Sequence, residues 1–584
     1  MDIPYEAKIR VLMVSLCIGS YGVLSNTLIL FRRSRLVLMW VLIFALLCSF
    51  YGLINFFKQP DMVLWVERHF VYEGRLASTY ICPNHFGHLL QMLMSFCLVL
   101  LFIPQAGLSL RLLAGYCLLA FPVTIYFTES RASILGMIAA LGVTILLMSL
   151  RKNKKLFFIL LIAIPLSTAV LLGGAWKYSE MFNRRMTPVV KFVAGIASEG
   201  FADAPVNDFR PKTWLDTLDM IKEKPLVGFG PGSYHFAFPE FRKRFSGARI
   251  ISGHPHNEYL EIASEYGLIG LGLFAFAWGY GLIRILIFSL KTDQQHHAFM
   301  AMAFIGTAVG TMVHSFFDFE MNEFQNAMVF SLLAAIAVGP ICGRKLDALK
   351  NRALFRYRLS SWVFAGISLI ALVLSVGTFS SAFLRAMADR AFESKSIDSS
   401  IPLYLAAIRM DSSNWKAYRG LGELYAQERR YTLEKELKAE LGELQKSFLE
   451  KGLEFNPLSP RIALSLGRIN VALGEQAEGL EMLKKITVMR PFNDQYWWFY
   501  GLELRKAGHY EDALAVFRQA HRIKRSVTVK KNIQWLERKL KKGPLPEKKE
   551  EAVQRPGLVM PKFDLGEGAA DESLDSLFEL MESN

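Results

Sequence analysis

The chain has 584 residues, of which 52% are hydrophobic and 20% are charged, and it carries a formal net charge of +15. This length excludes a single small domain. The apolar residues are concentrated in stretches long enough to cross a bilayer, so we expect a multi-pass membrane protein with a soluble part. The positive charge does not indicate nucleic acid binding, because basic residues of membrane proteins collect beside the spans on the cytoplasmic side.

Ten apolar stretches of about 17 to 27 residues predict transmembrane helices. The predicted spans cover residues 9–31, 36–57, 86–104, 110–127, 132–150, 156–175, 266–290, 298–316, 325–342 and 360–386. The first span follows Lys8 and Arg10 without a small-residue cleavage site, so we expect it to be retained rather than removed as a signal peptide. The sequence therefore predicts an all-α fold, with a polytopic transmembrane helix bundle over residues 1–386 and a soluble helical domain after it.

Five connections between the predicted spans are basic, and all five fall on one side. They contain Arg32, Arg33 and Arg35; Arg111; Arg151, Lys152, Lys154 and Lys155; Lys291; and Arg344, Lys345, Lys350, Arg352, Arg356 and Arg358. The positive-inside rule makes this side cytoplasmic, so the long loop 176–265, the turn 317–324 and the C-terminal domain are expected outside. The same count puts the N-terminus outside, and a further span upstream of residue 1 stays an open alternative.

Arg131 stands at the outer end of an apolar predicted helix, within the sequence Thr128-Glu129-Ser130-Arg131. A charged side chain is costly there unless it reaches the membrane surface or binds a partner. Both interpretations remain open: a side chain that extends to the surface, and a cation for an anionic substrate.

The outer loop 176–265 is too long for a simple connection, so it is where we expect a functional site. From residue 176 to 256 it has 12 basic and 8 acidic residues, an excess that the positive-inside rule does not explain. Arginine binds phosphate oxygens through two parallel hydrogen bonds, so an anionic substrate would account for the excess. For Arg242 and Arg244 a solvated charged surface is an equally good interpretation.

The stretch 253–270 leads from a polar turn into the seventh predicted span. Asn257 is expected to cap this helix, with acidic residues in the first turns, where the helix dipole favours them. His256 then lies at the outer membrane surface, where an imidazole can accept a proton from a hydroxyl. His254 completes a His-x-His pair, but no third ligand at a fixed spacing accompanies it, so no metal is predicted and His254 is expected to tolerate substitution better. The six cysteines form no disulfide framework or metal-binding motif either.

Residues 387–542 have the composition of a soluble domain and repeat with a period of 34 residues, which is typical of tetratricopeptide helix pairs. The residues at this spacing are Pro457 and Pro491, Gly467 and Gly501, Gly474 and Gly508, and Leu480 and Leu514. A unit around Trp415 is offset by 45 residues from the next one, which predicts an 11-residue insertion around residues 432–446. Such stacks expose a concave surface for partners, although a helical appendage without a partner remains the alternative.

The chain becomes polar and then acidic after Pro544, which predicts a disordered acidic tail over residues 543–584. Four hydrophobic residues from Leu574 to Met581 have helical spacing. We favour incidental hydrophobics over a short docking helix.

Motifs that combine histidine, arginine and glycine surround the long outer loop. The most specific block consists of His256, Asn257, Tyr259, Leu260, Glu265, Gly267, Leu268, Ile269 and Gly270. Further motifs contain Arg75 with Pro83, Asn84 and His85; Ser130-Arg131-Ala132-Ser133-Ile134-Leu135; Arg210 and Trp214; Pro225, Gly228, Gly230, Pro231 and Gly232; and His314, Ser315 and Asp318. This pattern resembles the O-antigen ligase and polymerase superfamily of bacterial envelope glycosyltransferases, over about residues 60–340. The chain differs from the usual family pattern in having fewer N-terminal spans and a final span that leads into the repeats.

The resemblance implies transfer of a glycan from a polyprenyl diphosphate carrier to an acceptor at the outer face of the bacterial cytoplasmic membrane, with inversion and without metal or cofactor. Arg131 and Arg210 would stabilise the departing diphosphate, and His256 would activate the acceptor hydroxyl. The substrate-binding residues that it suggests are Arg75, Asn257, Tyr259, Arg242, Arg244 and Asp318. A lipid, glycan or protein acceptor would decide between ligase and polymerase, and the repeat domain favours a protein acceptor or partner.

Two other classes of function remain open. A transporter or flippase of lipid-linked glycans is disfavoured by the scarcity of ionisable residues and broken helix pairs inside the predicted spans. A non-catalytic scaffold would act through the repeats. Substitution of His256 with unaltered partner binding would separate a scaffold from an enzyme.

Overall fold

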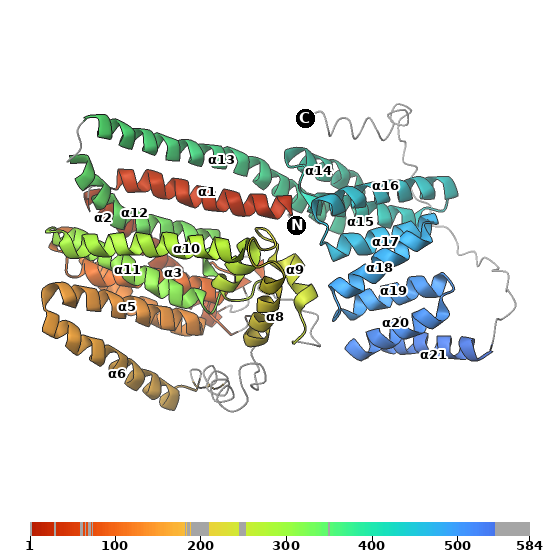
Figure 1. Ribbon diagram of the computed structural model, residues 1–584, viewed down its shortest axis with the longest axis horizontal. Helices are drawn as coiled ribbons and strands as arrows, with labels where there is room; N and C mark the ends of the chain where they lie inside the picture. Colours follow the sequence, from red (N-terminus) through yellow and green to blue (C-terminus); the bar gives the residue numbers. More distant parts are fainter. Residues whose placement is uncertain are drawn as a thin grey trace. The chain divides into compact units, whose positions relative to one another are not determined.

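The structure is a computed structural model that describes residues 3–28, 31–58, 62–64, 66–67, 72, 74–180, 183, 187, 209–244, 253–347 and 351–542 (Figure 1). The chain forms two compact units, one made chiefly of Glu6–Phe245 and Ser252–Leu374, the other chiefly of Ser375–Asn584. The division falls within the long helix α13 (Asn351–Glu393), which also contains the domain boundary proposed at residue 386. The predicted acidic tail 543–584 and residues 188–208 and 245–252 of the outer loop lie outside the described residues.

The first unit is built from α-helices, so the all-α prediction is confirmed. Its helices are α1 (Pro4–Thr27), α2 (Phe31–Lys58), α3 (Pro83–Leu100), α4 (Leu108–Thr128), α5 (Arg131–Lys152), α6 (Lys154–Tyr178), α8 (Arg210–Glu223), α9 (Tyr234–Phe241), α10 (Glu258–Lys291), α11 (Gln295–Ser315), α12 (Phe324–Asp347) and the first part of α13. Two 3₁₀ turns, η2 (Pro104–Ala106) and η3 (Glu320–Asn322), connect some of them. The described strands, β1 (Met62–Val63) and β2 (Val66–Glu67), are a two-residue antiparallel pair.

Eight helices in the described part of the chain are long and apolar enough to cross a membrane. They cover Pro4–Ser25, Arg32–Lys58, Leu108–Thr128, Arg131–Lys152, Glu258–Lys291, Gln295–Ser315, Phe324–Ile341 and Trp362–Glu393. The other two predicted spans, 86–104 and 156–175, correspond to helices α3 and α6. These two helices are not among the eight for different reasons. α3 is less apolar because it carries His85, His88 and Gln91. α6 includes residues 171 and 172, whose side chains lie outside the described part of the chain. The chain is a multi-pass membrane protein.

Helix α3 lies at the centre of the bundle, and nearly all of its 18 residues are buried. It packs against α4, α5 and α11, of which the last two are labelled in Figure 1. α5 and α11 approach so closely that a Cβ atom on Gly310 would lie 2.5 Å from the carbonyl oxygen of Gly136. Small residues allow such contacts between membrane helices, where association depends on close packing rather than on the exclusion of water. This close packing fixes the positions of α3 and α11, and therefore of the polar residues at their ends.

Helix α10 is interrupted near its start. Gly267 has φ +69° and ψ −177°, outside the helical region and in a conformation that L side chains rarely adopt. A break of this kind leaves backbone groups unpaired, which is costly in a membrane unless other parts of the protein bind them.

The loop between α8 and α9 binds the backbone groups at this break. Leu268 donates its N–H to the carbonyl of Pro225 at 2.7 Å, and the N–H of Gly230 donates to the carbonyl of Glu265 at 2.9 Å. The Glu265 carboxylate accepts hydrogen bonds from the N–H groups of Gly232 and Tyr234, at 2.9 and 3.1 Å. The glycine-rich motif of the outer loop therefore completes a broken membrane helix and attaches the loop to it.

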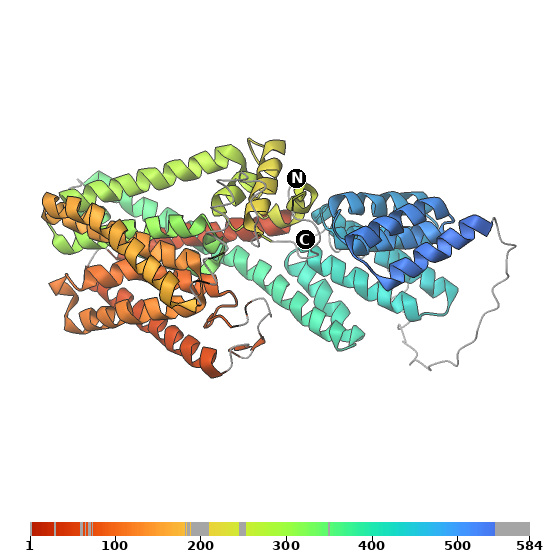
Figure 2. The same ribbon diagram turned by 90° about the horizontal axis from the view of Figure 1, so that it is seen from below.

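The second unit contains the predicted tetratricopeptide helix pairs (Figure 2). Its helices are α14 (Ile397–Met410), α15 (Trp415–Tyr431), α16 (Lys435–Phe455), α17 (Pro460–Leu473), α18 (Gln476–Met489), α19 (Asp494–Lys506), α20 (Tyr510–Ile523) and α21 (Val527–Lys542). α15 packs on α16, α17 on α18, and α19 on α20. Gly474 and Gly508, which are 34 residues apart, both have positive φ at the end of the first helix of a pair.

The predicted insertion lengthens the helices of one pair. α15 and α16 have 17 and 21 residues, whereas α17 and α18 have 14 each. A further pair precedes them, because Leu384, Ala388 and Phe392 near the end of α13 share a core with Tyr404 and Ala407 of α14. The sequence repeat did not reveal this pair, since its first helix continues from an apolar span.

We predict that Gly267→Ala destabilises the membrane unit by at least about 2 kcal/mol, the usual cost of a strained backbone position. The added Cβ would lie 2.0 Å from the carbonyl oxygen of Leu226, and backbone atoms cannot move aside as a flexible side chain can. Gly272→Ala on the same helix is the control, because no atom lies within 4 Å of its added Cβ. The thermal unfolding midpoints of the detergent-purified variants test this, and equal midpoints would contradict the role given to Gly267.

Candidate functional site

Polar side chains from several elements meet at one end of the helix bundle. Asn84 lies in the first turn of α3, Arg210 begins α8, His256 precedes α10, and Asp318 lies in the turn after α11. With Arg75, which precedes α3, these residues form a connected group that we call the His256 cluster. Four of its members were candidates from the sequence, and Asn84 appeared there only as part of a motif.

The backbone of His256 is left-handed, with φ +53°. A residue other than glycine in this conformation is strained, and such strain is found most often at functional sites. The neighbouring chain holds it in place, since Trp214 Nε1 of α8 donates a hydrogen bond of 2.9 Å to the carbonyl of Pro255. The rings of Phe209 and Phe319 lie edge-on to the imidazole, with centroid distances of 5.2 and 5.0 Å.

His256 and Asp318 form a hydrogen-bonded pair. His256 Nδ1 lies 2.8 Å from Asp318 Oδ1, and the two residues are separated by 62 positions in the sequence. An ionised carboxylate can only accept, so Nδ1 carries a proton, and in the neutral form of the ring the lone pair is on Nε2. The His256 side chain is 21% exposed, whereas the carboxylate beneath it is buried. The pair therefore presents an oriented imidazole that can take up a proton at Nε2.

Three further groups bind the Asp318 carboxylate. Asn84 Nδ2 donates to Oδ2 at 2.5 Å, the N–H of Phe319 donates to Oδ1 at 3.2 Å, and Arg210 Nη2 lies 3.8 Å from Oδ2. Arg75 supports Asn84, because its Nη2 donates to Asn84 Oδ1 at 2.5 Å. The side chains of Arg75, Asn84 and Asp318 thereby connect the loop before α3 to the turn after α11.

The two acids in the turn after α11 differ in charge. Burial by itself raises the pKa of Asp318. The charge and hydrogen bond of His256 and the charge of Arg210 lower it by more, so the pKa lies well below its ordinary value. Burial raises the pKa of Glu320 well above its ordinary value. Asp318 is therefore ionised near pH 7, whereas burial favours the neutral form of Glu320, and environments that shift two acids in opposite directions are typical of catalytic sites.

Asn257 and Tyr259 fix the start of α10. The side chain of Asn257 accepts the N–H of Leu260 at 3.0 Å, which confirms the predicted helix cap, and its amide donates to the carbonyl of Phe316 at 3.1 Å. The Tyr259 hydroxyl donates to the carbonyl of Met312 at 2.8 Å. Both residues were candidates for substrate binding, and both connect α10 to the end of α11. These contacts hold His256 opposite Asp318.

The structure gives Arg244 two acidic partners. Its Nη1 lies 2.7 Å from Asp216 Oδ1 and 2.8 Å from Asp219 Oδ2, both on α8. The Asp216 carboxylate also accepts the backbone N–H of Lys243 and of Arg244. Arg244 therefore holds the end of α9 against α8 and does not join the His256 cluster. Arg242 is buried beside it, and this burial lowers the pKa of its guanidinium.

Arg131 is the first residue of α5. Ser130 caps this helix by accepting the N–H of Ser133 at 3.2 Å. Three residues before Arg131, the carbonyl of Thr128 accepts a hydrogen bond of 2.9 Å from Arg75 Nε. The turn that carries Arg131 is thus attached to the His256 cluster through its backbone.

His254 has a defined role that the sequence did not suggest. Its Nδ1 lies 2.8 Å from Glu261 Oε1, and its ring stacks on Phe319 with a centroid distance of 3.9 Å. Glu261 also lies 3.6 Å from Arg10 Nη2 of α1. Since Phe319 contacts His256 as well, His254 supports one wall of the site, and its tolerance of substitution stays a prediction. The spacing of His254 and Glu261, seven residues, gave no signal by itself.

A buried layer lies beneath the cluster. His314 Nε2 is 3.1 Å from Glu320 Oε1, and His314 Nδ1 is 2.8 Å from Gln91 Oε1. Glu258 accepts hydrogen bonds from the Ser315 hydroxyl and, at 2.7 Å, from the N–H of Met321. The His-Ser motif of the sequence pointed to this region, whereas Gln91 gave no local signal because its partner His314 is 223 residues away.

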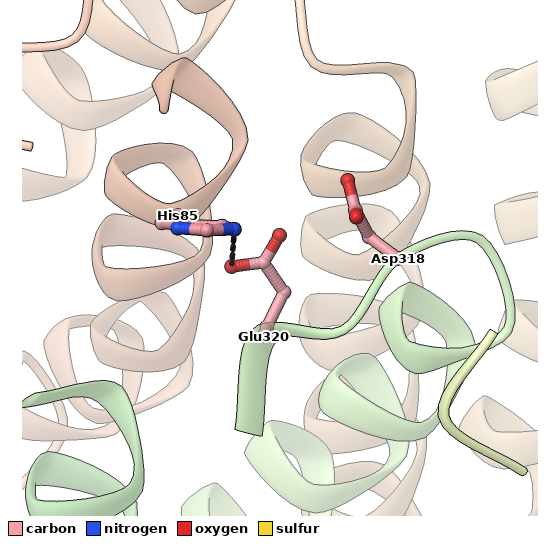
Figure 3. Close-up of side chains that lie close together, drawn as sticks. All are labelled: His85, Asp318 and Glu320. Atoms are coloured by element: carbon pink, nitrogen blue, oxygen red, sulfur yellow. Dashed lines mark ion pairs between the residues drawn. The ribbon is translucent and has the colours of Figure 1, made fainter. Parts of the chain in front are cut away.

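His85, Asp318 and Glu320 bring potential metal-ligand atoms within 4.8 Å of one another (Figure 3). The sequence predicted no metal, and this stays a prediction. Asp318 already accepts from His256 and Asn84, and Glu320 from Asn326 Nδ2 at 3.4 Å. The guanidinium of Arg210 close to Asp318 makes the donor set a poor fit for a divalent cation.

Two known protein families match parts of this chain, and one of the matched segments contains residues of the His256 cluster. Residues 115–275 match the family model for O-antigen ligases. A second match, to the tetratricopeptide repeat, covers residues 385–437 and includes the pair formed by the end of α13 and α14. A search of curated proteins found no match.

These matches confirm the resemblance drawn from the motifs. The O-antigen ligase segment contains Arg131, Arg210 and His256, while Arg75 and Asp318 lie outside it. The match supports a membrane enzyme that transfers glycans, as a ligase or a polymerase.

We predict that Asp318→Asn destabilises the membrane unit by about 3 to 5 kcal/mol, the usual cost of removing one partner from a buried charged group. Because the pKa of Asp318 is lowered on folding, its contribution is present above its unfolded pKa of about 3.9 and is lost as the pH falls through the folded value. The difference in thermal midpoint between wild type and variant should therefore be full from pH 7 down to about pH 4, and it should shrink as the pH is lowered below the unfolded pKa of about 3.9. The exposed Asp293→Asn is the control, and an unchanged midpoint for Asp318→Asn at pH 7 would contradict the prediction.

Proposed function

We propose that this protein transfers a glycan from a polyprenyl diphosphate carrier to an acceptor hydroxyl at the outer face of the bacterial cytoplasmic membrane, without a metal or cofactor. The observation that carries the proposal is the hydrogen bond of 2.8 Å between His256 Nδ1 and Asp318 Oδ1, with Arg210 at the same carboxylate. An oriented base beside a cation at a membrane surface is what this reaction needs.

The reaction has one displacement step. The acceptor oxygen attacks the anomeric carbon while its proton moves to His256 Nε2, and the bond from that carbon to the diphosphate oxygen breaks. The electron pair leaves with the diphosphate, and the configuration at the anomeric carbon inverts. Asp318 keeps the imidazole in the required tautomer and stabilises the imidazolium that forms.

The departing diphosphate gains negative charge, which fixed cations stabilise best where water is scarce. Arg210 and Arg131 are the residues to which we assign this role. Arg75 is a positioning residue, since its hydrogen bonds to Asn84 and to the carbonyl of Thr128 hold the frame of the site. Of the two loop arginines, Arg242 keeps its place as a substrate-binding candidate, whereas Arg244 already binds two carboxylates.

Buried polar groups do not favour a transporter. His88 and His314 are fully buried in α3 and α11, so the bundle has more interior ionisable residues than the sequence suggested. His314 hydrogen-bonds Glu320 directly beneath Asp318, and His88 Nε2 lies 3.2 Å from the Thr311 hydroxyl one turn below. These groups gather at the end of the bundle that carries the His256 cluster, where they can support a site.

We assign the repeat domain to binding a protein acceptor or partner.

We predict that His256→Ala lowers transfer by about two to four orders of magnitude, the usual range for loss of general acid–base catalysis. Wild-type activity should fall as the pH is lowered, because a protonated imidazole cannot accept the acceptor's proton. Release of product from a lipid-linked donor by the purified protein is the measurement, with His296→Ala at the opposite end of α11 as control. Normal turnover in His256→Ala, or loss of the wild-type reaction with a chelator, would overturn the metal-free base mechanism.

A separate prediction concerns Arg210, whose guanidinium lies beside the Asp318 carboxylate. Arg210→Ala should abolish most transfer while leaving membrane insertion intact, and Arg210→Lys should restore little, because an ammonium group lacks the planar fork that binds two phosphate oxygens. Arg244→Lys is the matched control and should retain activity, since an ammonium group can still bind Asp216 or Asp219. Full activity of Arg210→Ala, measured with the same donor, would remove Arg210 from the site.

Orientation is tested independently of catalysis. Reporter fusions after residues 358 and 395 should report opposite sides of the membrane, with the second one outside, because the basic connections are expected in the cytoplasm. Two cytoplasmic reports would mean that α13 does not cross the membrane, and the outer location of the repeats would be wrong.

A further inference from the structure

A cavity of about 720 Å³ lies between the ends of α3 and α5 and the beginnings of α6 and α11. Its walls are largely apolar and include Leu98, Ile145, Leu156 and Phe299. A volume of this size is in the range of ligand-binding pockets. The His256 cluster does not account for it, because none of the cluster's residues lines the cavity.

The cavity and the His256 cluster lie at opposite ends of the same helices. α5 begins at Arg131, beside the cluster, and reaches the cavity at Arg151 and Lys152. α11 begins at the cavity with Gln295 and ends next to Asp318. Helices of 21 and 22 residues are about 30 Å long, the thickness of a bilayer core. The cavity therefore belongs to the other membrane leaflet, which the glycan donor's reacting end does not reach.

The cavity combines apolar walls with positive charge. Arg151 and Lys152 line it together with a single acid, Asp293. Arg151 is oriented by two hydrogen bonds, from Nη1 to the carbonyl of Ser289 at 2.7 Å and from Nη2 to that of Thr292 at 2.6 Å. A guanidinium has five N–H donors, so three remain for an anion after these two bonds. Lys152 is exposed and adds a second positive charge.

We propose that this cavity binds an anionic phospholipid, with the phosphate headgroup at Arg151 and Lys152 and an acyl chain along the apolar walls. The charge of the lining selects for an anionic headgroup, and the length of the helices puts that headgroup at the membrane surface. Basic pockets between membrane helices are known to bind such headgroups. The proposal does not depend on the glycan-transfer function, since it concerns the opposite end of the bundle.

The test compares lipids of equal chain length on the purified full-length protein. Binding of phosphatidylglycerol and phosphatidylcholine is measured by native mass spectrometry and by the shift in the thermal midpoint, with inorganic phosphate as a third probe. We expect retention of phosphatidylglycerol and stabilisation by it, and little effect of the other two. Lys152→Gln should weaken phosphatidylglycerol binding about fivefold, the effect of one basic residue near an anionic headgroup.

Matched variants separate a specific site from general attraction to the surface. Lys154→Gln removes the same charge two residues away, at an exposed position outside the cavity lining, and should bind phosphatidylglycerol like the wild type. Leu156→Trp narrows the cavity without changing charge and should also weaken binding. Equal losses in Lys152→Gln and Lys154→Gln, equal binding of both lipids by the wild type, or equal stabilisation by phosphate alone would overturn the proposal.

Discussion

The site depends on one buried negative charge. Asp318 lies in a turn at the end of α11 with its side chain 1% exposed, and a carboxylate is stable there only if other groups replace its lost water. His256, Asn84 and Arg210 supply these interactions from three other elements. Folding the bundle around this charge therefore brings together an imidazole and a guanidinium that are far apart in the sequence.

The elements around Asp318 have little freedom to move. Asn257 and Tyr259 bond the start of α10 to backbone carbonyls of α11 and of the residue just after it, and Trp214 bonds α8 to the chain just before His256. The left-handed backbone of His256 is the strained point in this arrangement. Its strain is tolerated because contacts on both sides fix the residue.

The broken helix α10 explains a second part of the sequence pattern. The glycine-rich stretch 225–232 and the acid at Glu265 belong to separate motifs of the sequence pattern, and the structure shows that they bind each other through backbone groups and the carboxylate. In a membrane protein an interrupted helix must find internal hydrogen bonds. The motif therefore stabilises the join between the outer loop and the membrane helix, and it positions the site without touching the His256–Asp318 pair.

The sequence by itself determined the all-α class, the presence of a helix at each predicted span, the repeat period and the cap at Asn257. These features follow from local periodicity, composition and short motifs, which depend on residues close in the chain. Only the tertiary structure decided that Asp318 binds His256, that Asn84 and Arg75 complete the cluster, that Arg244 is used by Asp216 and Asp219, and that His254 packs against Phe319. Apart from Arg75 and Asn84, which are nine positions apart, those assignments require residues 25 to 234 positions apart to come into contact. Such contacts are fixed by how helices pack around a buried charge, which no local pattern records.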